Sequence, residues 1–394
     1  MRIETHGRDA RATTAASTRN SELGTQPSTD LRGFDWRVLW ERTRGQEAFA
    51  FTNLARPAEC LVFAPDGRTL VSGGDDGIHL WDIVERRHLG LFPGPDPGPT
   101  SSVLAPTLEE LRPMLDASPA VVEHLKVQPV IQDYLDALGH TTRTREIRSL
   151  AFTPDGKHLL VGSRDFVSSW NFATRAFDFA IPEEQATISA SATGDLFVVA
   201  NNQKLEPDDE RRSAHQQSAL VYSFARRRLV AELPGYGWHA AVSPDGQYVA
   251  AANRTNHAVL WRPATGETVP LSQGRQLTYL LSFSPDGRTL FACSEGRIFL
   301  WDIASRRIKA YLRSDLGRVA WSPDGRFLAG LARNQTIGLW PVPPGDSPDG
   351  APEWPPFLDP QTILHGHEAA VTALAFSPDG RWLPSAAEDR SIRS

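Results

Sequence analysis

The stretch His365–Glu368, HGHE, is the first place in this sequence where side chains could support chemistry. Imidazole and carboxylate groups bind transition metals, but two histidines spaced i, i+2 need a third protein ligand. Cys60 and Cys293 are the only cysteines, too few for a cysteine-ligated zinc site or a disulfide framework. Both lie in strand-like surroundings and are interpreted as small buried apolar residues. We therefore expect no bound metal and no cofactor.

Recognisable catalytic motifs are also missing from the sequence. No Gly-rich phosphate loop opens a helix, and neither Gly-x-Ser-x-Gly nor His-Glu-x-x-His occurs. A net charge of −6 argues against a domain devoted to the nucleic-acid backbone, which would normally be basic. No apolar run approaches the roughly 18–20 residues that a membrane-spanning helix needs. The sequence thus predicts a protein that is not an enzyme and binds neither nucleic acid nor membrane.

A repeated turn organises most of the 394 residues. Its sequence is Ser-Pro-Asp-Gly or a near copy, and a degenerate copy, SATGD, stands at Ser191–Asp195. Short β-prone runs flank each copy, which predicts a β-hairpin. The six clear copies lie at Ala64–Gly67, Thr153–Gly156, Ser243–Gly246, Ser284–Gly287, Ser322–Gly325 and Ser377–Gly380.

A third β-prone run follows most of these hairpins and ends on an aromatic residue. The distance from the turn proline to that aromatic is 16 or 17 residues in five copies, and a fourth run comes next. Four antiparallel strands in about 40 residues are typical of a β-propeller blade. The aromatic residues are Trp81, Trp170, Trp261, Trp301 and Trp340, with Tyr222 in the degenerate copy.

Two stretches reading LWDI, at Leu80–Ile83 and Leu300–Ile303, resemble the WD-repeat family. The stretch HGHEAAVTALAFSPDGRW at His365–Trp382 strengthens the resemblance, which covers residues 34–394 apart from insertions. It implies a ring-shaped propeller that serves as a platform for other proteins. It also implies a structural hydrogen-bonded set of His, Ser, Asp and Trp within a blade. Its members here would be His367, Ser385, Asp389 and Trp40; Ser72, Asp76 and Trp81; and Ser163, Asp165 and Trp170.

The number of repeats predicts seven blades. Six copies are complete or nearly so, whereas the seventh, around Pro378, runs out before its tryptophan. Residues 34–52 match the second half of a blade, so the last blade is expected to be built from both chain ends, which removes an exposed edge. Gln46–Thr52 would be its outer strand. Trp36–Glu41 and Arg390–Ser394 compete for its third position.

Segments outside the repeat define the expected domain organisation. Residues 1–33 have no hydrophobic periodicity and are interpreted as a disordered tail before the propeller at 34–394. Residues 93–146 begin with a Pro/Gly-rich linker and continue with helical signals, including a capping box at Thr107 and Glu110, so a small helical insertion is expected between blades one and two. Residues 341–360 are expected to form a proline-rich loop.

The WD-repeat resemblance also suggests where a partner would bind. In such propellers the residue before the turn aspartate, on the loop between the second and third strands, faces the upper surface. Blades one and seven would be acidic there and blades two, four and six basic, so the face is hypothesised to orient a partner electrostatically. Unrelated solvated charges are the alternative. The residues at this position are Asp75, Arg164, Arg254, Arg333 and Glu388.

The function that these features favour is a non-catalytic scaffold, cytoplasmic and monomeric, that binds protein or peptide partners on the propeller faces. A stand-alone sensor or regulatory propeller of a bacterial-type multidomain signalling system is the alternative. A lactonase-like enzymatic propeller would need carboxylates or histidines pointing into the channel. The inner runs, such as CLVF and SLAF, are apolar, which disfavours it.

Overall fold

The computed structural model contains two units, Met1–Gly33 and Phe34–Ser394. It describes residues 49–92 except 53, residues 146–343 with gaps at 164–166, 182–185, 202–217, 254–256, 272–277, 295–296, 313–317 and 333–334, and residues 357–394. The expected tail at 1–33, Trp36–Glu41 with Trp40, and all but the last residue of the expected helical insertion lie outside these ranges. All of the described residues belong to the second unit.

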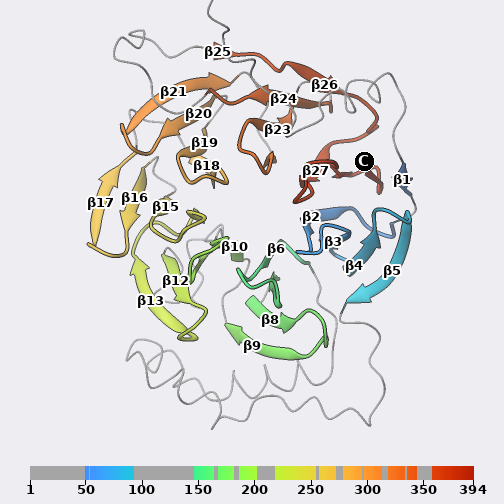
Figure 1. Ribbon diagram of the computed structural model, residues 1–394, viewed down its shortest axis with the longest axis horizontal. Coiled ribbons are helices and arrows are strands. Elements are labelled where there is room, and N and C mark those ends of the chain that lie inside the picture. The colour runs from blue at the N-terminus through green and yellow to red at the C-terminus, as the bar shows by residue number, and fades with distance from the viewer. Residues whose placement is uncertain are drawn as a thin grey trace, which may run out of the picture. The chain divides into compact units, whose positions relative to one another are not determined.

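Every helix or strand in the described ranges is a β-strand, and these strands form seven sheets that surround a centre (Figure 1). All strand pairs within the sheets are antiparallel except one, which adds a fifth strand to one sheet. One edge strand of each sheet is innermost, and most of these innermost strands contact the innermost strands of neighbouring sheets. The described part of the second unit is therefore an all-β, seven-bladed propeller, as the repeat predicted. We number the blades one to seven from β2 onward.

The bounds of the strands follow the repeats closely. Blade one consists of β2 (Ala58–Phe63), β3 (Thr69–Gly74), β4 (Gly77–Asp82) and β5 (Arg87–Phe92). Blade two consists of β6 (Ser149–Phe152), β7 (His158–Gly162), β8 (Val167–Asn171) and β9 (Phe177–Ile181). Blade three consists of β10 (Ala186–Ala190), β11 (Leu196–Asn201), β12 (Ala219–Ser223) and β13 (Arg228–Leu233). Blade four consists of β14 (His239–Val242), β15 (Val249–Ala252), β16 (Ala258–Arg262) and β17 (Glu267–Pro270).

The later blades depart from this regular order. Blade five consists of β18 (Thr278–Phe283), β19 (Thr289–Ser294), β20 (Arg297–Asp302), β21 (Arg307–Leu312) and a fifth strand, β25 (Phe357–Leu358). Blade six consists of β22 (Val319–Trp321), β23 (Phe327–Leu331), β24 (Ile337–Pro341) and β26 (Thr362–Leu364). Blade seven consists of β27 (Val371–Leu374), β28 (Ser385–Ala387), β29 (Ile392–Arg393) and β1 (Ala50–Phe51).

Most of the expected proline-rich loop at 341–360 lies outside the described residues, and strand is found at both of its ends. Pro341 is the last residue of β24, and Phe357–Leu358 pairs in parallel with β21 on the outer edge of blade five. The Phe357 ring stacks on Tyr311 with 5.0 Å between centroids, which fixes the added strand beside blade five. The chain then returns to blade six as β26. Two residues of strand between prolines were too short a signal to be recognised in the sequence.

The turn between the first two strands of each blade is held by its own side chains. In blade four, the Ser243 hydroxyl donates to the Asp245 carboxylate at 2.6 Å and accepts from Tyr248 N–H at 2.9 Å. The same carboxylate oxygen accepts from Gln247 N–H at 2.9 Å. Gly246 has a φ of 73°, a conformation that glycine adopts without strain. The side chains of the tetrapeptide thus satisfy the backbone N–H groups that follow it, which explains why it recurs in these hairpins.

Blade seven contains strands that are far apart in the sequence. β1 pairs antiparallel with β29 in the register Ala50↔Arg393 and Phe51↔Ile392. β29 in turn pairs with β28, so Arg390–Ser394 contributes the third position of this blade. The backbone of Phe49 exchanges hydrogen bonds with that of Ser394 in both directions.

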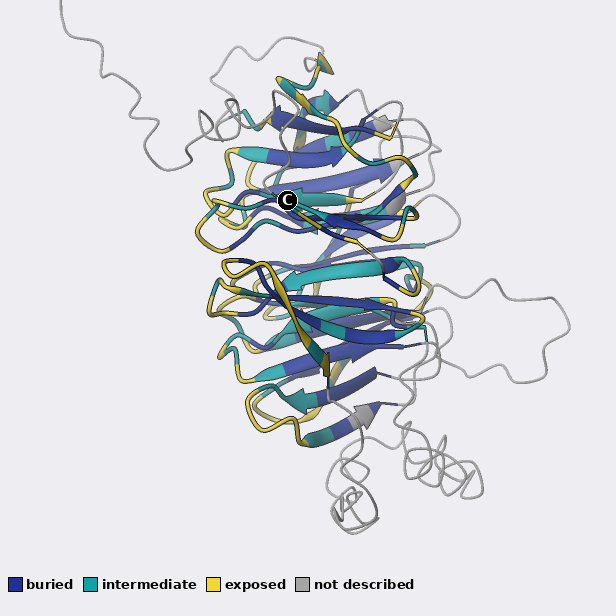
Figure 2. Cartoon of the chain, turned by 90° about the vertical axis from the view of Figure 1, so that its right-hand side faces the viewer, coloured by how far each residue is buried: buried dark blue, intermediate teal, exposed yellow. Residues whose placement is uncertain are grey.

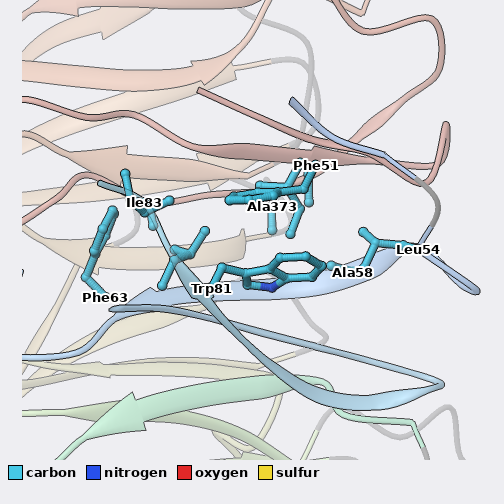
Figure 3. Packing of buried hydrophobic residues seen from close by; sticks show 11 residues of the cluster. Phe51, Leu54, Ala58, Phe63, Trp81, Ile83 and Ala373 are labelled. Carbon is cyan, nitrogen blue, oxygen red and sulfur yellow. The ribbon is translucent and has the colours of Figure 1, made fainter. Parts of the chain in front are cut away.

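The apolar core lies between neighbouring blades. Strand interiors are buried and the turns at both ends of the blades are exposed (Figure 2). Between blades seven and one, Phe51, Trp81 and Ala373 belong to one cluster of buried residues (Figure 3). Because each cluster draws on two blades, a blade is stabilised chiefly by its neighbours.

Candidate functional site

His367, Ser385 and Asp389 of blade seven form a buried hydrogen-bonded group, whereas Trp40, the fourth member that the family resemblance implied, lies outside the described residues. His367 Nε2 lies 2.8 Å from the Ser385 hydroxyl, and its Nδ1 lies 2.9 Å from a carboxylate oxygen of Asp389. Burial alone would raise the pKa of Asp389. Hydrogen bonds from Ser391, His367 and the Glu368 N–H outweigh burial and lower this pKa to about 2. The carboxylate is therefore charged at neutral pH and fixes the imidazole.

The order of these three side chains is that of a Ser–His–Asp hydrolase triad, so its chemistry must be considered. The His367 side chain is 3% exposed and Ser385 is 4% exposed. A nucleophile needs access to its substrate, and this hydroxyl faces the interior of a blade. The group is thus suited to hold the loop before β27 against the turn between β28 and β29, not to attack a substrate.

The corresponding residues of blades one and two are arranged differently. The Trp81 indole N–H donates to the Ser72 hydroxyl at 2.8 Å without an intervening histidine. Asp76 instead accepts from Arg56 N–H at 3.3 Å. In blade two the Trp170 indole donates to Ser168 at 2.9 Å, whereas Ser163 is buried elsewhere in the blade and Asp165 lies outside the described residues.

The other repeat aromatics occupy the third strands of their blades. Tyr222, Trp301 and Trp340 are buried, and Trp261 is half-buried. The Trp340 indole N–H is buried with no hydrogen-bond partner among the residues that the structure describes. In blade six the position matching Ser72 is Gly330, so the usual hydroxyl acceptor is missing.

The predicted partner-binding positions can be placed only in part. Asp75 lies in the turn between β3 and β4, and Glu388 lies in the turn between β28 and β29. Both are exposed, and neither carboxylate makes an ion pair or hydrogen bond with another described residue. Blades one and seven are neighbours, so these two charges belong to equivalent turns of adjacent blades. Arg164, Arg254 and Arg333 lie outside the described residues.

Charged groups at the start of the inner strands were not predicted from the sequence. Arg318, just before β22, lies 3.7 Å from Glu59 in β2, although blade seven separates their blades. This ion pair therefore joins two blades that are not neighbours in the ring. His239, at the start of β14, accepts a hydrogen bond from Leu281 N–H at 3.2 Å. Only the folded ring brings these residues together, and no local motif marks them.

The electrostatics around Arg318 do not favour catalysis. Burial, reinforced by the charge of Arg318, lowers the pKa of His239 to about 4, so the ring is neutral. Burial raises the pKa of the Cys60 thiol to about 12, which leaves it without nucleophilic thiolate at neutral pH. Within the described ranges, no three or more His, Cys, Asp or Glu side chains are grouped to hold a metal ion.

No helix in the described part of the chain is long and apolar enough to cross a membrane.

Two arginines of outer turns pair with carboxylates of the preceding blade. Arg227 lies 3.1 Å from Asp178, and Arg306 lies 2.9 Å from Glu267. These exposed pairs fix neighbouring blades weakly at best.

Comparison with known proteins places this geometry among WD repeats. The family model described as "WD domain, G-beta repeat" matches residues 56–82, 133–167, 278–302 and 358–394. Telomerase protein component 1 of Rattus norvegicus is 22% identical over 364 residues, which are 90% of this chain and 11% of the relative. Small ribosomal subunit protein RACK1 of Brassica napus is 31% identical over 107 residues, 27% of this chain and 33% of the relative.

A third relative, Telomerase Cajal body protein 1 of Mus musculus, is 30% identical over 165 residues, which are 37% of this chain and 28% of the relative. The chain thus spans well under half the length of each of these three relatives.

Proposed function

Because this chain belongs to the WD-repeat family, we propose that it is a non-catalytic scaffold that binds protein or peptide partners on the faces of its propeller. The observation that carries the proposal is the contrast between its buried and its exposed polar groups. Buried hydrogen bonds join the side chains of His367, Ser385 and Asp389 to one another. Asp75 and Glu388 are exposed, and neither carboxylate is paired with another described residue.

The turns that carry these two carboxylates are attached to rigid, paired strands. A charge held on such a frame loses little conformational freedom when a partner binds, which favours affinity. The two turns lie on adjacent blades, so one partner can contact both. A complementary, basic partner surface would be attracted to this acidic part of the face. The basic positions predicted at Arg164, Arg254 and Arg333 would face an acidic part of the same partner.

Site-specific photo-crosslinking tests this assignment. A photoreactive phenylalanine is placed singly at Asp75, at Glu388 and, as control, at Arg288, which lies in a turn at the opposite end of its blade. The same cellular proteins should crosslink from positions 75 and 388 but not from 288. Crosslinking only from 288, or none above background from any position, would contradict the proposal.

The regulatory-propeller alternative is favoured by one comparison. Telomerase protein component 1 matches 90% of this chain with 11% of its own length, so its similar region is a small part of a longer protein. If this chain regulates an enzyme, that enzyme would be its partner. Addition of the purified propeller would then change the captured enzyme's turnover, whereas a plain scaffold would leave it unchanged.

We also infer that the pairing of β1 with β29 closes the ring and that residues 93–146 form a helical insertion. Closure is supported by the antiparallel register of the two strands and by the Thr372 hydroxyl, which donates to the Ala58 carbonyl of blade one.

Far-ultraviolet circular dichroism of the chain with and without residues 93–146 tests the insertion, since its removal should abolish the helical signal. A cytoplasmic, monomeric state is proposed from the sequence, and cell fractionation with sedimentation analysis tests it.

A further inference from the structure

Two imidazoles share a hydrogen bond across the outer strands of blade one. His79 belongs to β4 and His88 to β5, and His79 Nδ1 lies 3.0 Å from His88 Nε2. Such a bond needs one nitrogen that donates a hydrogen and one that accepts it. It therefore forms when both rings are neutral or when only one is protonated. It is lost when both are protonated, because neither facing nitrogen then has a lone pair and the two cations repel each other.

The histidine pair packs against the aromatic contact between β1 and blade one. The Trp81 ring lies 4.5 Å from the His88 ring and 4.7 Å from the Phe51 ring of β1, between centroids. Arg86, two residues before His88, adds a second contact, because its guanidinium lies 5.4 Å from the centroid of the Phe49 ring. β1 is only two residues long, so side-chain contacts of this kind carry much of its attachment.

Few charged groups near the imidazole pair can balance its protonation. The Asp76 carboxylate lies 3.4 Å from His79 Nε2, and that nitrogen is buried without a hydrogen-bond partner among the described residues. The other charged residues on the surrounding strands and turns are Asp75, Asp82, Glu85, Arg86 and Arg87 of blade one and Arg393 of β29. Asp82, Glu85 and Arg393 have charged partners of their own. Asp76 can thus balance one positive charge of the pair, and no described residue of β1 balances a second.

We propose that the His79–His88 pair is an acid-sensitive switch, which keeps β1 attached to blade one at neutral pH and loosens it when both rings are protonated. The second proton removes the hydrogen bond and drives the two rings apart, so the exposed His88 ring moves toward solvent. That ring then no longer packs on Trp81, and the contact of Trp81 with Phe51 weakens. The rest of the propeller stays folded, since the other blades do not contain this pair.

The pH at which the switch acts follows from the titration of His88. Partial removal from water, followed by the charge of His79, holds the pKa of His88 below its ordinary value of about 6.5. The folded protein therefore takes up the second proton less readily than the unfolded chain does. The contribution of the neutral ring to stability is fully present above about pH 6.5 and is lost as the pH falls below that value.

Hydrogen–deuterium exchange of the full chain at pH 7.5 and pH 5.0 tests the switch, after correction for the intrinsic effect of pH on exchange. Wild type is compared with His88→Gln and with His79→Gln, each of which leaves only one ring to protonate. His365→Gln is the matched control at another exposed histidine. Melting temperatures at pH 7.5 show which variants fold, and either of the first two suffices for the comparison.

In wild type and H365Q, protection of the amides of β1 should fall at least tenfold at pH 5.0, while protection of β15 in blade four stays unchanged. In H88Q and H79Q, protection of β1 should be the same at both pH values, whatever its level. Unchanged protection of β1 in wild type would overturn the proposal, whatever the variants do. An equal fall in wild type and H88Q would also overturn it, as would a fall of β15 in parallel with β1, which would indicate general acid destabilisation.

Discussion

The rings of Phe51 and Trp81 lie 4.7 Å apart between centroids and link the two sides of one blade interface. Phe51 comes from β1 of blade seven, and Trp81 comes from the third strand of blade one. β1 is only two residues long, so its backbone pairing alone would be a weak attachment. The contact between Phe51 and Trp81 buries additional apolar area beside the pairing of β1 with β29.

Removal of β1 should therefore destabilise the whole propeller. We predict a large fall in melting temperature on deletion of residues 1–53. Phe51→Ala alone should lower the free energy of unfolding by about 3–5 kcal/mol, measured by urea denaturation. Phe357→Ala is the control, because Phe357 is 54% exposed against 8% for Phe51, and it should cost no more than about 1 kcal/mol. An unchanged melting temperature after the deletion would show that blade seven does not depend on β1.

The buried group around His367 predicts a specific pH dependence of stability. The pKa of Asp389 is lowered to about 2, below the value of about 3.9 for an unfolded aspartate. This carboxylate therefore stabilises the fold above about pH 4, and its contribution is lost as the pH falls from about 4 through about 2. Asp389→Asn should lower stability at pH 7 and show a smaller further loss between pH 4 and pH 2 than wild type.

Chemical denaturation at several pH values measures this difference. Asp75→Asn removes one carboxylate that is exposed and unpaired with any described residue, and its stability should follow wild type across the acid range. If D389N and wild type lost stability in parallel below pH 4, the buried carboxylate would not be the group responsible.

In blade six, Gly338 leaves room for the ring of Trp340, whose buried indole N–H has no hydrogen-bond partner among the described residues. A Cβ added at Gly338 would lie 2.5 Å from the Trp340 ring, whereas one added at Gly330 would lie 3.5 Å from it. Gly338→Ala should therefore destabilise the protein by about 1–3 kcal/mol through overpacking. The same substitution should cost less in a Trp340→Phe background, because the smaller ring makes room. Equal costs in the two backgrounds, by a double-mutant cycle of unfolding free energies, would refute the contact.

Repetition made the blades predictable from the sequence. The Ser-Pro-Asp-Gly turn and the aromatic 16 or 17 residues after its proline are local features, and each reflects hydrogen bonds within one hairpin or one blade. The set of His367, Ser385 and Asp389 was implied by the WD-repeat resemblance, and all three residues belong to blade seven. Such short-range requirements leave a pattern in the residues themselves.

Contacts between blades could not be predicted in this way. The ion pair of Arg318 with Glu59 depends on the closed ring, and the addition of Phe357 to blade five depends on where a proline-rich segment leads. The His79–His88 pair lies within one blade, yet it was missed because strand pairing with a bulge between Leu80 and Trp81 sets which residues face each other. Neither residue type nor spacing reveals that register.

The affinity of a crosslinked partner for the acidic face is the most direct measurement. Dissociation constants are compared for wild type, for Asp75→Lys with Glu388→Lys, and for Lys157→Glu with Arg288→Glu, whose exposed charges lie on turns at the opposite ends of blades two and five. Reversal of both acidic charges should weaken binding at least tenfold, about 1.4 kcal/mol or more, and the control should change it less than twofold. Unchanged binding by D75K/E388K, with loss in the control, would contradict a partner-binding face at Asp75 and Glu388.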